Sequence, residues 1–207
     1  MALVERQDRV SDEEVDPRRW VEIDHYIAGF LSPADPALEA ALRANEAGGL
    51  PTHSVSPHQG KLLMLLAQAV GARKILEIGT LGGYSTIWLA RAVQGGRVIT
   101  LEVKPKRAEI ARTNLARAGL INSVDIRLGA ALDTLPTLGE DGHFDLIFID
   151  ADRANLASYF QWAVKLSHLG SLIIVDNVIP HGPAIRSEEP AVRACISSTN
   201  LPRPSPK

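Results

Sequence analysis

Five short apolar runs of strand length follow one another between residues 74 and 176, and segments with helical spacing separate them. The runs cover residues 74–78, 97–102, 124–128, 144–150 and 171–176, and the intervening helices are expected at 84–92, 105–118, 131–135 and 156–166. Strands that are apolar on both faces are typical of a parallel sheet with helices on each side. The pattern therefore predicts an α/β fold with a doubly wound, mostly parallel sheet. Its ligand site should lie beyond the carboxyl ends of the strands.

The segments on either side of this pattern divide the chain into an arm, one domain and a tail. Residues 1–19 are rich in charge and predict a surface arm, after which apolar residues recur at helical spacing over 20–31. A second helix is expected over 37–47, and Ser56-Pro57 is a typical start for a third. The residues expected on the buried face of this third helix are Leu62, Leu63, Leu65, Leu66, Ala69 and Val70. The domain is then predicted to cover residues 20–178, and 179–207 to form an irregular tail.

Composition limits the classes of partner. Lys and Arg number 22 against 24 Asp and Glu, and this net charge of −2 argues against a nucleic-acid partner. No apolar stretch is long enough to span a bilayer, and charged residues stand where a signal peptide would need an apolar core. The single cysteine, Cys195, cannot form an intrachain disulfide. We therefore expect a cytoplasmic protein with no membrane partner.

A glycine-rich turn follows the first strand, over residues 77–85. It is not the dinucleotide-binding fingerprint, because Leu81 stands where the second glycine is required. The second strand ends at Glu102, where a carboxylate can accept hydrogen bonds from both hydroxyls of a ribose. A nucleoside cofactor without phosphates suits this combination. On these residues alone, a purely structural turn beside a solvated glutamate fits equally well.

Acidic and amide side chains end the fourth and fifth strands. Asp150 ends the fourth, and Asp176 and Asn177 end the fifth, so their oxygens should converge at one edge of the sheet. Oxygen ligands alone favour a hard cation, Mg²⁺ first, with Ca²⁺ or Mn²⁺ as alternatives. The competing interpretation is that these side chains only cap the following helices. Asp152 is expected either to contact cofactor or substrate, or to start the next helix.

Four motifs together resemble one family. They are L-E-I-G-T-L-G-G-Y-S-T at 76–86, V-I-T-L-E at 98–102, F-I-D-A-D at 148–152 and V-D-N at 175–177. In this order and spacing they resemble the cation-dependent O-methyltransferases, which include catechol and caffeoyl-coenzyme A O-methyltransferases. The resemblance implies a Rossmann-like sheet with strand order 3-2-1-4-5 and S-adenosylmethionine (SAM) as the cofactor. The cofactor-binding positions that it implies are Val55, Glu77, Gly79, Thr80, Ser85, Glu102 and Ala131. The metal ligands that it implies are Asp150, Asp176 and Asn177.

The reaction implied is methyl transfer to a small aromatic substrate with two neighbouring hydroxyls. A phenol with a pKa of about 10 is a poor nucleophile at neutral pH. A divalent cation that chelates both oxygens stabilises the phenolate and holds one oxygen in line with the methyl group. As a ligand of that cation, Asp150 would take part in catalysis, and Asp152 would contact the substrate. The resemblance and the apolar helix around Trp20 and Phe30 also predict a homodimer.

Two departures from the family pattern keep alternatives open. Arg153 stands where the family has a lysine base, and a guanidinium stays protonated, so it can hold a phenolate but cannot take a proton. Residues 188–196 resemble the start of the family's last helix, and the proline-rich tail then replaces the remainder, so the family's antiparallel strand pair is expected to be missing. The alternatives are a catalytically impaired SAM-binding protein of the same fold and a nucleotide-dependent oxidoreductase, which Leu81 disfavours.

Overall fold

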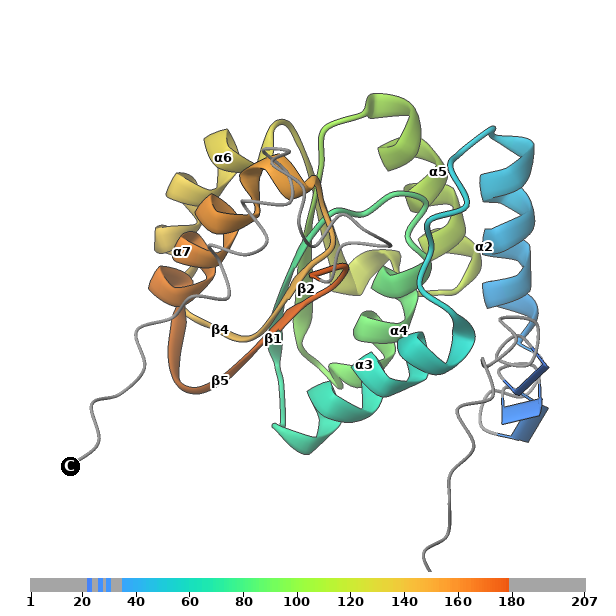
Figure 1. Cartoon of the computed structure of the whole chain (residues 1–207), viewed down its shortest axis with the longest axis horizontal. Coiled ribbons are helices and arrows are strands. Elements are labelled where there is room, and N and C mark those ends of the chain that lie inside the picture. Colours follow the sequence, from blue (N-terminus) through green and yellow to red (C-terminus); the bar gives the residue numbers. More distant parts are fainter. Residues whose placement is uncertain (1–21, 24–25, 28, 31–34, 179–207) are drawn as a thin grey trace, which may run out of the picture.

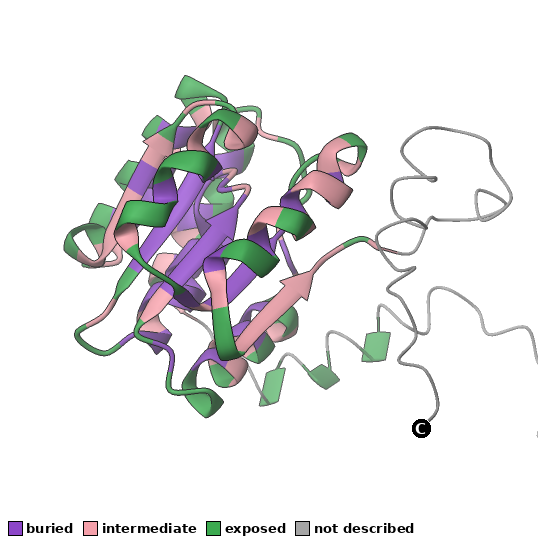
Figure 2. Ribbon diagram, turned by 90° about the vertical axis from the view of Figure 1, so that its left-hand side faces the viewer, coloured by how far each residue is buried: buried purple, intermediate pink, exposed green. Residues whose placement is uncertain are grey.

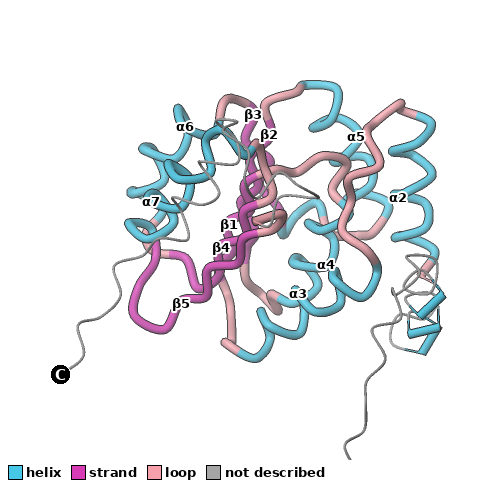
Figure 3. The backbone as a smooth tube through the Cα atoms, viewed as in Figure 1, coloured by secondary structure: helices cyan, strands magenta, loops and turns pink. Residues whose placement is uncertain are grey.

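The computed structural model describes residues 22–23, 26–27, 29–30 and 35–178 and is built around one five-stranded sheet. The strands are β1 (Lys74–Ile78), β2 (Arg97–Glu102), β3 (Val124–Leu128), β4 (Phe144–Ile149) and β5 (Ser167–Val175). They lie in the order β3-β2-β1-β4-β5, and all four pairings are parallel (Figure 3). The predicted doubly wound sheet and its strand order are therefore confirmed.

Helices cover both faces of this sheet (Figure 1). One face carries α3 (Pro57–Ala69), α4 (Tyr84–Ala92) and α5 (Pro105–Arg117), with α2 (Pro36–Ala47) packed on the outside of α4 and α5. The other face carries α6 (Ala131–Thr134) and α7 (Leu156–Leu166). The 3-10 turns are η1 (Ile121–Ser123), η2 (Leu135–Asp141) and η3 (Arg153–Asn155). The change of face between β1 and β4 is the switch point at which folds of this kind bind ligands.

The core consists of two apolar layers, one on each side of the sheet. Ile75 pairs in register with Val98 and Leu146, and all three side chains are fully buried in the layer under α3, α4 and α5. Their chain neighbours Leu76, Ile99 and Ile147 are equally buried in the layer under α6 and α7. Successive strand residues point to opposite faces, so consecutive apolar residues are needed where a strand is buried on both sides. Figure 2 shows this buried centre, with β5 only partly covered.

The structure corrects the buried face predicted for α3. The start at Ser56 is confirmed, since Ser56 and Gln59 form a reciprocal capping box. The helix buries Gly60, Leu63 and Ala67, however, whereas Leu62 is 54% exposed and Leu65 and Val70 are also exposed. The reason is tertiary: a Cβ on Gly60 would lie 2.3 Å from the indole ring of Trp88. The small-residue face of α3 therefore meets α4, and several leucines face outward.

Strand β5 also begins earlier than its apolar run predicts, at Ser167 rather than Ser171. Polar contacts hold this additional segment. Ser171 donates its hydroxyl to the Phe144 carbonyl at 2.7 Å, and its oxygen accepts from the His168 N–H at 2.8 Å. The His168 ring lies 2.9 Å from the Asp145 carboxylate. Because side-chain hydrogen bonds fix this segment, no apolar pattern marks it in the sequence.

Several predictions fall outside the described residues. They are the arm over residues 1–19, the tail over 179–207 and the missing antiparallel strand pair. Within the helix predicted over 20–31, the described residues 22–23, 26–27 and 29–30 are helical. No helix in the described part of the chain is long and apolar enough to cross a membrane.

Candidate functional site

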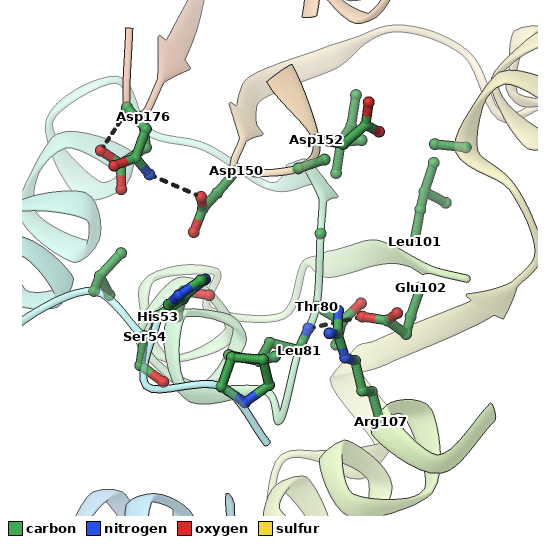
Figure 4. Close-up of a pocket in the computed structure, with 18 of the residues that line it drawn as sticks. His53, Ser54, Thr80, Leu81, Leu101, Glu102, Arg107, Asp150, Asp152 and Asp176 are labelled. Atoms are coloured by element: carbon green, nitrogen blue, oxygen red, sulfur yellow. Dashed lines mark hydrogen bonds between the residues drawn. The ribbon is translucent and has the colours of Figure 1, made fainter. Parts of the chain in front are cut away.

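A cavity of about 860 Å³ opens at the carboxyl ends of the strands. Its wall combines the loop before α3, the turn after β1 and the ends of β2, β4 and β5 (Figure 4). The predicted site residues that line it are Val55, Gly79, Thr80, Ser85, Glu102, Ala131, Asp150, Asp152, Arg153, Asp176 and Asn177. The tertiary structure thus brings together segments that lie more than a hundred residues apart. Glu77 is the predicted site residue that this wall does not include.

The turn between β1 and α4 fits closely against β4. Gly79 has a φ of +106°, and a Cβ added to it would lie 2.0 Å from the Asp150 carbonyl oxygen. Gly83, which precedes α4, has a φ of +81°. Leu81 has a φ of +50°, which is uncommon for a residue with a side chain. The turn therefore needs glycine at Gly79 both for its backbone conformation and for space.

The carboxylate of Glu102 is held in place at one side of the pocket. Its Oε2 accepts the Leu81 N–H and its Oε1 accepts the Lys104 N–H, each at 2.9 Å. Each oxygen keeps a further lone pair, so the fixed carboxylate can still accept two hydroxyl protons. This is the arrangement that recognition of a ribose requires. Figure 4 shows Arg107 from α5 pointing toward the same side.

Glu77 is fully buried behind the turn. It accepts the hydroxyl protons of Ser85 at 2.6 Å, Thr100 at 2.6 Å and Thr86 at 2.5 Å. Burial raises the pKa of Glu77 to about 7, and the three hydroxyl hydrogen bonds oppose that rise. Its side chain therefore lies beneath the pocket wall rather than in it.

The ends of β4 and β5 place two carboxylates and an amide at the opposite side of the pocket. The Asn177 Nδ2 donates to Asp150 Oδ1 at 3.3 Å, and the Asn177 N–H donates to Asp176 Oδ1 at 2.7 Å. Asn177 has a φ of +58°, which turns the chain so that its side chain can reach back to β4. Burial and the nearby charge of Asp176 raise the pKa of Asp150 to about 6, and the Asn177 hydrogen bond opposes the rise. Figure 4 shows Asp150 and Asp176 on the same side of the pocket.

Asp152 starts the next turn and also lines the pocket. Its Oδ1 accepts the Asn155 N–H at 3.0 Å, and its Oδ2 accepts the Tyr159 hydroxyl at 2.5 Å. The expectation that Asp152 starts a helix is therefore confirmed, for the 3-10 turn η3 that precedes α7. Burial, followed by the hydrogen bond to Asp152, raises the pKa of Tyr159 above its usual range.

Other pocket residues were missed by sequence reasoning. They include His53 and Gln59 near the start of α3, Arg107 in α5 and Tyr159 in α7. None of these four follows a strand directly, so the strand-end pattern carries no signal for them. His53 is the clearest case, because its imidazole lies on the Asp150 side of the pocket (Figure 4).

Comparison with known proteins agrees with this geometry. A model of the O-methyltransferase family matches residues 32–201. A catechol O-methyltransferase from Mycobacterium tuberculosis is 54% identical over 171 residues, which cover 82% of this chain and 77% of the relative. The crystal structure of an O-methyltransferase from Bacillus cereus in complex with SAH is 50% identical, with a TM-score of 0.84 and coverage of 87% of this chain and 84% of that one.

A second solved structure extends the agreement to the methyl donor. The O-methyltransferase TomG from Streptomyces achromogenes, in complex with SAM, is 43% identical, with a TM-score of 0.83 and coverage of 87% and 83% of the two chains. These likenesses leave no support for the alternative of a nucleotide-dependent oxidoreductase. They confirm the resemblance that the four motifs carried. The chain belongs to the O-methyltransferase family and is a SAM-dependent O-methyltransferase.

Proposed function

We propose that this enzyme transfers the SAM methyl group to one hydroxyl of a small catechol-like acceptor, with the help of a divalent cation. The observation that carries the proposal is the cluster of Asp150, Asp176 and Asn177 in the same pocket as the ribose-type acceptor Glu102. The name of the Mycobacterium tuberculosis relative, a catechol O-methyltransferase, supports the class of acceptor. Cofactor and acceptor would then meet between the two sides of the pocket.

The donor set fits a hard cation. The negative charge of Asp176 lies close to Asp150 and makes ionisation of Asp150 less favourable. A cation bound between the two carboxylates would remove this repulsion. Among the described residues, no three His, Cys, Asp or Glu side chains converge, so the third donor would be Asn177. Rotation of its amide would present the oxygen in place of Nδ2. A bound Mg²⁺, Ca²⁺ or Mn²⁺ would lower the pKa of a chelated phenol.

Arg153 is suited to hold the acceptor oxygen. It lines the pocket, and no hydrogen bond or ion pair joins its side chain to another residue in the described part of the chain. A guanidinium group can stabilise an oxyanion but cannot remove a proton. Asp152 is occupied by Asn155 and Tyr159, and it would shape the acceptor side of the pocket through that turn.

A transfer assay with and without a chelator tests the proposal. Purified enzyme is stripped of metal, and methylation of catechol by SAM is followed before and after Mg²⁺ is restored. The matched control acceptor is the monomethyl ether of catechol, which offers only one free hydroxyl. We expect transfer to catechol alone, and only with the cation. Equal rates without the cation, or with the ether, would contradict the proposal, and SAH binding without any transfer would favour the impaired enzyme.

We also propose that the enzyme forms a homodimer through its N-terminal helix. Tyr26 and Phe30 lie on the described part of that helix, 70% and 73% exposed, with ring centroids 5.0 Å apart. Exposed aromatic side chains of this kind are typical of protein interfaces. Light scattering should give twice the chain mass of 22.4 kDa, and Tyr26→Ser with Phe30→Ser should halve it. A stable monomer of the wild-type chain would refute the dimer.

A further inference from the structure

The turn between β1 and α4 contains a residue in an unfavourable conformation. Leu81 has a φ of +50°, and a residue with a side chain adopts this left-handed region only where the surrounding structure fixes it. The Leu81 N–H donates to Glu102 Oε2 at 2.9 Å. The carbonyl of the next residue, Gly82, accepts from Asn114 Nδ2, also at 2.9 Å. Hydrogen bonds from β2 and from α5 therefore hold the turn on the two sides of Leu81.

Asn114 reaches the turn from the buried face of α5. Its side chain is 0% exposed. Besides the Gly82 carbonyl, its Nδ2 donates to Asn45 Oδ1 at 3.3 Å, and its Oδ1 accepts from the Arg117 guanidinium at 3.0 Å. A buried amide is unfavourable unless its groups have partners, and here both ends of the amide have one. The direction of the Asn114 side chain is thereby fixed.

Asn45 lies on α2, against the outer side of the same turn. It is 5% exposed, and a Cβ added to Gly82 would lie 1.7 Å from its Oδ1. Its Nδ2 is buried without a hydrogen-bond partner in the described part of the chain. An unpaired buried donor is unfavourable, so an apolar side chain would serve better if this position only packed α2 against the turn. The bond from Asn114 to Asn45 Oδ1 gives the amide a role.

We infer that Asn114 is a positioning residue, which holds the turn through Gly82 so that the Leu81 N–H keeps the Glu102 carboxylate oriented toward the ribose of SAM. Neither Asn114 nor Gly82 belongs to the pocket wall, so the effect passes through the backbone of the turn. Asn45 supports Asn114 from α2. The inference rests on the ribose role given to Glu102, and it is independent of the proposed cation and acceptor.

The test compares the affinity for SAH with that for an analogue of SAH that lacks both ribose hydroxyls. Both are measured by calorimetry without metal or acceptor. In Asn114→Leu, the Gly82 carbonyl loses its donor and the turn is released. We expect SAH affinity to fall about tenfold, the effect of weakening one hydrogen bond to a charged group. Affinity for the analogue should stay within about twofold, so the ratio of the two affinities should fall about fivefold or more.

Leu115→Ala is the matched control for damage to α5. Leu115 is the next residue of that helix, is 0% exposed and lies outside the pocket wall. Its truncation should lower stability but leave the affinity ratio unchanged, because lost packing affects both ligands alike. If Asn114→Leu does not fold, Asn114→Ala removes the same donor without adding an apolar side chain, and the same ratio decides.

A double-mutant cycle with Glu102→Ala shows whether Asn114 acts through Glu102. If it does, adding Asn114→Leu to Glu102→Ala should change SAH affinity little. Losses that multiply in the double variant would overturn the inference, as would an unchanged ratio in Asn114→Leu. Full discrimination between SAH and the analogue in Glu102→Ala alone would overturn it as well, because it would refute the ribose role of Glu102.

Discussion

Replacement of Gly79 by alanine should disrupt both the fold and cofactor binding. The new Cβ would lie 2.0 Å from the carbonyl oxygen of Asp150 and 2.8 Å from its carbonyl carbon. That backbone cannot easily retreat, because the Asp150 N–H donates to the Ile78 carbonyl at 2.9 Å and β1 pairs with β4 up to this point. Positive φ costs a residue with a side chain about 1–2 kcal/mol. Overpacking adds about 1–3 kcal/mol, so the total is about 2–5 kcal/mol.

Gly71→Ala is the matched control. Gly71 also has a positive φ, +63°, but a Cβ there would have no atom within 4 Å. It should therefore cost only the backbone strain of about 1–2 kcal/mol. The free energy of unfolding of both variants is measured by urea denaturation followed by circular dichroism. Calorimetry with SAH gives the second readout, because Gly79 lines the pocket and Gly71 does not.

We expect the Gly79→Ala protein to be clearly less stable than the control and to bind SAH weakly or not at all. If Gly79→Ala fails to fold while Gly71→Ala folds, the prediction is equally confirmed. If the two variants differ by less than about 0.5 kcal/mol, the error typical of additivity, the close approach of the turn to β4 is refuted. Unchanged SAH affinity in Gly79→Ala would equally contradict the role of this turn in the pocket.

Three further predictions concern the pocket and the sheet edge. Asp176→Ala should abolish cation-dependent transfer but leave SAH binding largely intact in calorimetry, and joint loss of both would argue against separate sites. Arg153→Lys should raise the transfer rate at neutral pH if the enzyme lacks a base, because burial and a nearby cation lower the pKa of a lysine. An unchanged or slower transfer rate between about pH 6 and 10 would show that the arginine does not impair catalysis. The hydrogen bond to Asp145 raises the pKa of His168. The contact therefore contributes its full stabilisation at a pH below the ordinary histidine pKa, and this stabilisation is lost as the pH rises through the raised pKa. An NMR titration of Asp145→Asn should return the His168 pKa toward its ordinary value, and an unshifted value would contradict this.

Much of the fold could be predicted because its elements have strong local signals. The ends of β1, β2, β3, α4 and α7 coincide with those expected from the sequence. In β1 and β2, consecutive apolar residues mark a strand that is buried on both faces, whereas β3 alternates apolar and charged residues and is only partly buried. The start of β5 was missed because Ser167 and His168 are held by side-chain hydrogen bonds, which leave no periodic pattern.

The face of a helix was harder to predict than its presence. Leucines on α3 suggested a wide buried face, but the helix packs through Gly60, where Trp88 lies close. Which side is buried depends on the shape of the neighbouring helix, and the sequence of α3 does not contain that shape. The same holds for His53 and Arg107, whose places in the pocket depend on how loops and helices pack around the sheet.

The sequence by itself determined the parallel sheet, the pocket at its carboxyl edge and part of the residues that line it. The sheet and the place of the pocket follow from hydrophobic periodicity, which is a local property of the chain, whereas the cofactor positions followed from the resemblance to the family. The direction of individual side chains was decided only by the tertiary structure. Glu77 and Glu102 both stand at strand ends, but three hydroxyls draw Glu77 into the interior, while two backbone N–H groups hold Glu102 at the pocket. A buried carboxylate goes where its hydrogen bonds are satisfied, and those partners come from other elements of the fold.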